Sequence, residues 1–135
     1  MPSDLEASAS VVLEFWRLMA TNDFHSVKAV LADDFVLDWP QSGERIVGPE
    51  NFAVVNAEYP TEGVWSFALR RLVAEGPEVV THVEVTDGKQ SGEAISFFQL
   101  SGGKIQSIVE YWPDPFEPAA NRKHLVELRL PKGAA

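Results

Sequence analysis

The chain of 135 residues carries a net charge of -9, and 45% of its residues are hydrophobic, so it is long and apolar enough to bury one core. The net negative charge disfavours nucleic acid and anionic membrane surfaces as partners, because both attract positive charge. The absence of cysteine excludes disulfides, thiol catalysis and thiolate-based zinc sites. No apolar run reaches the length of a membrane span and the N-terminus shows no export signal, so we expect a cytoplasmic protein.

Three helices are predicted in the first half of the chain. Ser3 and Glu6 fit a capping box, and apolar residues then recur with helical period, which predicts a helix over residues 4–20. Residues 21–23 end this helix and begin a second, short one. Pro49 is predicted to open a third helix, because proline suits the first helical position.

The strands are predicted mainly in the second half. Residues 35–39 form one strand that ends at Pro40, and residues 41–44 form a loop. Four further runs read as strands bounded by turn residues: 64–74, 78–86, 92–100 and 104–112. Helices followed by a run of strands are typical of an α+β fold with helices on one face of an antiparallel sheet. A strongly bent sheet of this kind closes into a cone whose mouth is a natural ligand site.

The last residues differ in charge from the rest of the chain. Residues 119–135 hold four basic side chains and one acidic one. Residues 113–130 are predicted to be irregular at first and then to hold one helical turn or a short strand. The basic tail either packs onto the body or a second subunit, or remains solvated.

Three segments resemble the nuclear-transport-factor-2-like superfamily in its SnoaL-like branch: LADDFVLDWP at 31–40, RIVG at 45–48 and GKIQSIVEYW at 103–112. The resemblance covers about residues 5–116 and implies a single SnoaL-like domain over 1–135, with a tail at 117–135. It implies a cone-shaped, curved antiparallel or mixed sheet with about three helices on its concave side, a cystatin-like α+β roll. It also implies a homodimer through the sheet face. The family includes isomerases, cyclases, dehydratases, epoxide hydrolases and members that only bind or dimerise.

Comparison with ketosteroid isomerases, which belong to this superfamily, disfavours that particular activity. Their oxyanion-hole tyrosine and aspartic acid and their basic aspartate match Phe15, Ser96 and Trp39 here. Phe15 cannot donate a hydrogen bond, Trp39 cannot take a proton, and Ser96 is a weaker donor. The same comparison implies that the cavity is faced by Trp39, Ser96, Phe98, Glu110 and Trp112.

Comparison with limonene epoxide hydrolases points to a different set of groups. Their Arg-x-Asp and Asp-Tyr-Phe motifs match His82-Val83-Glu84 and Glu110-Tyr111-Trp112, which keep two carboxylates and one basic group. Asp38 is the nearest polar candidate for the residues that hold water in that family.

Glu110, His82 and Glu84 are therefore the candidate catalytic residues. His82 and Glu84 lie two apart on a predicted strand and share a face, which Glu110 could approach from a nearby strand. Crowded carboxylates in an apolar site divide into an acid and a base, and a histidine beside them can relay a proton. The alternating Val79, Thr81, Val83 and Val85 favour the opposite arrangement, in which His82 and Glu84 point outward. Glu110 could likewise form a buried ion pair with Arg70 or Arg71.

The expected ligand is a small, neutral, apolar organic molecule. Seven residues are predicted to contact it: Phe15, Asp38, Trp39, Tyr59, Ser96, Phe98 and Trp112. No cofactor and no metal are expected, because the sequence has no glycine-rich phosphate loop and only three scattered histidines. The predicted function is acid–base catalysis of the isomerase, cyclase, hydratase or epoxide hydrolase type. A non-catalytic binding protein or a dimeric interaction module remain the alternatives.

Overall fold

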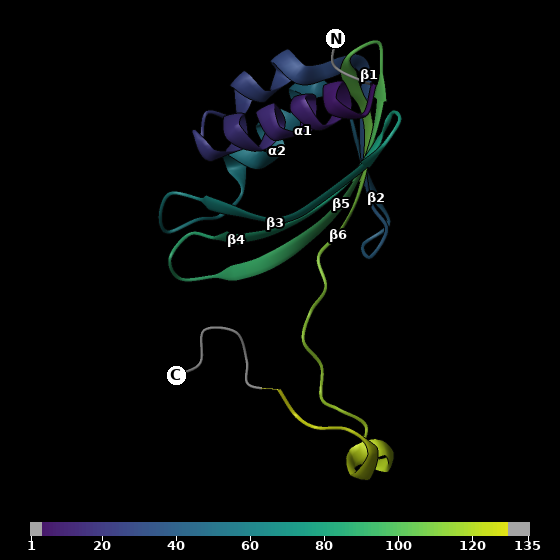
Figure 1. Ribbon diagram of the computed structural model, residues 1–135. Coiled ribbons are helices and arrows are strands. Elements are labelled where there is room, and N and C mark those ends of the chain that lie inside the picture. The colour runs from purple at the N-terminus through teal and green to yellow at the C-terminus, as the bar shows by residue number, and fades with distance from the viewer. Residues whose placement is uncertain (1–3, 130–135) are drawn as a thin grey trace.

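The computed structural model describes residues 4–129 and confirms the predicted α+β fold (Figure 1). The elements in chain order are α1 (Asp4–Ala20), η1 (Phe24–Val30), β1 (Leu31–Trp39), β2 (Glu44–Val47), α2 (Pro49–Glu58), β3 (Ser66–Glu75), β4 (Glu78–Thr86), β5 (Ser91–Ser101), β6 (Lys104–Tyr111) and η2 (Ala120–Leu125). Ser3, half of the predicted capping box, lies outside the described residues. Within the described part of the chain, no helix is both long and apolar enough to cross a membrane.

Two elements differ from the prediction around residues 31–47. The second helix is a 3₁₀ helix that ends at Val30, so β1 begins at Leu31, four residues earlier than expected. Strand β2 was not predicted. It has four residues and only Ile46 is buried, so it is too short to show an alternating pattern. Antiparallel pairing with β1 stabilises it.

The six strands form one mixed sheet in the order β2-β1-β6-β5-β4-β3. All neighbours are antiparallel except β1 and β6, which run parallel. The sheet bends strongly, and α1 and α2 lie over its concave face (Figure 1). Each strand therefore has an inner face toward these helices and an outer face away from them.

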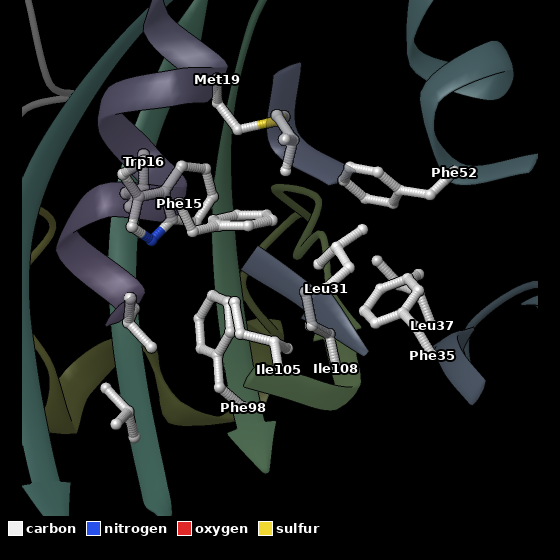
Figure 2. Packing of buried hydrophobic residues seen from close by; sticks show 14 of the residues in the cluster. Phe15, Trp16, Met19, Leu31, Phe35, Leu37, Phe52, Phe98, Ile105 and Ile108 are labelled. Carbon is white, nitrogen blue, oxygen red and sulfur yellow. The ribbon is translucent and has the colours of Figure 1, made fainter. Parts of the chain in front are cut away.

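The core packs between the helices and the inner face of the sheet (Figure 2). The Phe15 ring of α1 lies 5.3 Å from Phe98 of β5 and 5.9 Å from Phe52 of α2, measured between ring centroids. Phe35 of β1 meets Phe52 edge to face at 5.5 Å. These aromatic contacts join α1, α2 and the sheet into one packed unit.

Phe35 tests how much this packing contributes to stability. Its side chain is fully buried, so Phe35→Ala removes apolar contacts and leaves a cavity. We expect the free energy of unfolding to fall by ~3–5 kcal/mol, measured by urea denaturation. Val64→Ala, at an exposed loop position, is the matched control and should change it by about 0.5 kcal/mol or less. Equal losses in the two variants would contradict this account of the core.

Candidate functional site

A cavity of about 500 Å³ opens between the helices and the inner face of the sheet. Its wall is mainly aromatic and aliphatic, with polar groups gathered at the rim. The apolar lining residues are Phe15, Trp16, Met19, Phe24, Leu37, Trp39, Phe52, Val55, Tyr59, Trp65, Phe67, Val85 and Trp112. A hollow of this size and composition suits a small ring-bearing molecule.

Glu110 is the one acid in this wall that is buried, with a side chain on the inner face of β6. The indole nitrogens of Trp39 and Trp112 each donate a hydrogen bond to its Oε1, both at 3.0 Å. The Ser96 hydroxyl donates to Oε2 at 2.8 Å. Three neutral side chains thus hold one carboxyl group at the cavity wall.

The sheet register brings these four residues together. Ser96 of β5 lies directly opposite Glu110 of β6, so the two side chains share the inner face. Trp112 is two residues beyond Glu110 and points the same way. Asp38 pairs with Val109 in the parallel β1–β6 ladder, which places Trp39 beside Glu110.

Two further contacts fix the position of Trp112. The Gln41 side-chain amide donates to the Trp112 carbonyl at 3.1 Å, and its Oε1 accepts from the Trp112 backbone N–H at 2.6 Å. Gln41 therefore imitates a strand partner just after β6 ends. Gly92 lies under the indole, where a Cβ atom would sit 3.4 Å from its Cε3. This is ordinary van der Waals contact, so a methyl group would fit at position 92, whereas a longer side chain would meet the indole.

Burial raises the pKa of the Glu110 carboxyl, and the hydrogen bonds from Trp39, Ser96 and Trp112 offset only part of that rise. No cation lies within ion-pair distance of Glu110 among residues 4–129. The alternative role of Glu110 in an ion pair with Arg70 or Arg71 is therefore not found, and Arg70 pairs with Glu84. Neutral donors stabilise a carboxylate less than a full positive charge would, so desolvation is the larger effect.

The donor set also decides which oxygen exchanges a proton. An indole N–H can only donate, so Oε1 must act as an acceptor in both protonation states of Glu110. The Ser96 hydroxyl can either donate or accept, so it can serve Oε2 as an ionised oxygen or as an O–H. The proton of Glu110 therefore resides on Oε2.

The hypothesis that His82 and Glu84 line the pocket with Glu110 is wrong. Val79, Thr81, Val83 and Val85 occupy the inner face of β4, and the strand alternation turns His82 and Glu84 to the outer face. There His82 Nε2 lies 2.8 Å from Glu93 Oε1, and Glu84 pairs with Arg70. The expected pair of carboxylates with a relaying histidine is therefore not assembled in the cavity.

The other predicted ligand contacts divide into three groups. Phe15, Trp39, Tyr59 and Trp112 line the cavity. Ser96 and Phe98 are buried behind the wall, where Ser96 holds Glu110 and Phe98 packs on Phe15 and Trp16. Asp38 was placed wrongly, because it faces outward and forms a two-point ion pair with Arg45 of β2 at 2.6 and 3.0 Å. The unpredicted strand β2 supplies this partner. Binding by the lining residues stays a prediction.

Asp87, which the sequence indicates only as a turn residue, organises one side of the cavity rim. Its carboxylate accepts hydrogen bonds from the backbone N–H groups of Glu62, Lys89 and Gln90 at 3.1, 2.9 and 2.8 Å. The side-chain amide of Gln90 adds another bond at 3.0 Å, and these bonds hold the pKa of Asp87 well below its usual value. Asp87 thereby ties the loop after α2 to the β4–β5 turn, next to the cavity-lining Gln90.

Comparison with known proteins identifies the family. A SnoaL-like domain family model matches residues 12–108, and the chain belongs to this family. No match is found among curated proteins. No group of three or more histidine, aspartate or glutamate side chains able to hold a metal ion occurs in the described residues.

Solved structures with the same nuclear-transport-factor-2-like fold carry different proposed activities. A proposed ketosteroid isomerase from Kribbella flavida DSM 17836 is 30% identical with a TM-score of 0.87, over 97% of this chain and 95% of that one. An M. tuberculosis epoxide hydrolase of the limonene epoxide hydrolase-like type is 21% identical with a TM-score of 0.68, over 82% and 86%. A proposed SnoaL-like polyketide cyclase from Jannaschia sp. CCS1 is 14% identical with a TM-score of 0.72, over 83% and 89%. Solved structures of this fold thus carry the names of an isomerase, a cyclase and an epoxide hydrolase.

Glu110→Gln tests the raised pKa of Glu110. Folding raises the pKa of Glu110, so its contribution to the free energy of unfolding is largest at pH values below the usual pKa of glutamic acid. That contribution is lost as the pH rises through the raised pKa. Glutamine imitates the neutral acid, since its oxygen can accept from both indoles and its amide can donate to Ser96. We therefore expect the stability of Glu110→Gln relative to the wild type to increase from pH 4.5 to pH 8, measured by urea denaturation.

Glu78→Gln, at an exposed position that begins β4, is the control for a general effect of removing one negative charge. Its stability relative to the wild type should stay nearly constant between the same two pH values. A constant difference for Glu110→Gln, or one that is largest at acid pH, would show that burial does not control this carboxyl.

Proposed function

We propose that the protein binds a small, neutral, ring-bearing molecule in the aromatic cavity and that Glu110 transfers a proton on it. The observation that carries this proposal is a buried carboxyl with a raised pKa and no cationic partner in the described chain. Such a group gains and loses a proton closer to neutral pH than an exposed glutamate does. The aromatic wall favours a neutral substrate, since a charged one would lose its hydration without compensation.

The presence of one carboxyl in the apolar part of the cavity favours one class of reaction. Epoxide hydrolysis needs one group to activate water and another to protonate the opening ring. A single carboxylate suffices when it removes a proton from carbon and returns it elsewhere on the same molecule. The C–H electron pair then moves into an enol or enolate, and Oε2 of Glu110 carries the proton between the two steps. Isomerisation by proton transfer beside a carbonyl is therefore the reaction we propose.

Binding without chemistry is the second candidate, and the hydrogen bonds of Glu110 favour it. Both indoles donate to Oε1, which fills the two lone-pair positions of that oxygen. Only Oε2 keeps a free position, next to the bond from Ser96. In this second candidate, Glu110 serves to orient Trp39 and Trp112 against a ligand.

Exchange of carbon-bound hydrogen separates the two candidates. We would incubate the protein with 2-tetralone, a neutral bicyclic ketone with acidic C–H groups beside its carbonyl, in D₂O and follow proton loss by NMR. The wild type should accelerate exchange, and Glu110→Gln should slow it by about 10²- to 10⁴-fold, the usual range for loss of a general base. Both proteins should still bind the ketone, as shown by a raised melting temperature.

Glu44→Gln is the matched control, because Glu44 lies at the rim of the same cavity and hydrogen-bonds Ser42. It should retain the exchange rate of the wild type. Undiminished exchange in Glu110→Gln would exclude Glu110 as the base. A raised melting temperature without any exchange above the buffer rate would favour the binding protein instead.

A further inference from the structure

Beyond Trp112 in the cavity wall, the chain continues as an arm, residues 113–129, that leaves the body of the domain (Figure 1). Prolines at 113, 115 and 118 explain its course, since proline cannot donate to a strand ladder and stiffens an extended segment. The arm nonetheless carries large apolar side chains. Phe116, Leu125 and Leu128 are 75 to 83% exposed. Leu125 and Leu128 lie close together along the chain with Val126, which is 46% exposed. Apolar exposure grouped in this way marks a surface that contacts another molecule.

The outer face of the sheet is the second exposed apolar surface. Val73 of β3, Phe97 of β5 and Tyr111 of β6 point away from the helices and are 39 to 67% exposed. The Phe97 and Tyr111 rings lie edge to face at 6.2 Å, so they form a continuous apolar patch in the middle of this face. No helix covers this patch, because α1 and α2 lie on the opposite, concave side (Figure 1).

The direction and length of the arm relate these two surfaces. The arm departs from the end of β6 on the side of the sheet away from α1 and α2 (Figure 1). Seventeen residues span at most ~60 Å when extended, which is enough to run along a second molecule that lies against the outer face. The alignment with the Kribbella flavida protein covers 97% of this chain and therefore extends through the arm. That solved chain thus has a segment that aligns with most of the arm.

Charge indicates what the second molecule is. Residues 119–135 carry four basic side chains and one acidic one, whereas the preceding residues hold the other seven basic and nineteen acidic ones. The far half of the arm, residues 119–129, holds three of these basic side chains against one acid, so this half is complementary in charge to the acidic body of a second copy. Its apolar residues are complementary to the outer-face patch. A second copy of the chain supplies both features.

We infer that two copies of this chain exchange their arms, each arm packing its apolar residues on the outer sheet face of the other copy. This goes beyond the sheet-face dimer that the family resemblance implies, because it makes the segment after β6 part of the interface. It is independent of the function proposed for Glu110.

Sedimentation velocity of the full chain measures the interaction directly. The wild type should be a dimer of two 14.9 kDa chains at micromolar concentration. Leu125→Asp in the arm and Val73→Asp on the outer face should each raise the dimer dissociation constant about tenfold or more, since a charge is then buried in an apolar contact. Leu13→Asp, on the exposed side of α1, is the matched control and should leave the constant unchanged.

Cross-linking decides whether the contact joins two chains. The sequence has no cysteine, so single cysteines can be introduced without ambiguity. Chains with Leu125→Cys are mixed with chains with Phe97→Cys and treated with a short bis-maleimide. A product containing both chains supports arm exchange. A monomeric wild type, a Leu125→Asp dimer as tight as the wild type, or cross-linking only when both cysteines lie in one chain would each overturn the inference.

Discussion

The carboxyl group of Glu110 is the point on which the site depends. Removing it from water is costly, and the fold compensates with two indole N–H groups and one hydroxyl rather than with a cation. Those three donors come from the end of β1, from β5 and from the residue after β6. The parallel β1–β6 pair and the antiparallel β5–β6 pair must therefore both be in register before the carboxyl is satisfied. A shift of one residue in either pair would leave a buried acid without its partners.

Much of the fold could be predicted from local patterns in the sequence. Strands β3 to β6 have turn residues at their ends, β4 alternates clearly, and Pro49 marks the start of α2. Strand β2 could not be predicted, because its four residues form a strand only through pairing with β1. The early start of β1 was missed for a related reason, since Leu31 continues the apolar period of the helix before it while its backbone is extended.

The candidate site was predictable only in part. Glu110 between apolar neighbours on its strand was a sound signal, because such a position places a carboxyl in the core. His82 and Asp38 were placed in the cavity on the basis of their correspondence to family motifs. The alternation of side chains along their strands turns both outward, and the structure follows the alternation. Trp39 and Trp112 were expected at the cavity, but their hydrogen bonds to Glu110 were not foreseen. Such bonds depend on the register between strands that are distant in the sequence. Asp87 was missed as an organiser of the rim because its partners lie in a separate loop.

The close approach of the Trp112 ring to Gly92 has an evolutionary consequence. A Cβ atom at position 92 would be in ordinary contact with the ring, so a side chain larger than alanine there and a large ring at position 112 would compete for one volume above β5. A lineage that replaces Trp112 by a smaller residue would also lose a donor to the Glu110 carboxyl and open space that residue 92 is free to occupy. Positions 92, 110 and 112 are thus expected to drift as a correlated set across the family. Descendants with a bulkier residue at 92 would then have a cavity of different shape and acidity on the same scaffold.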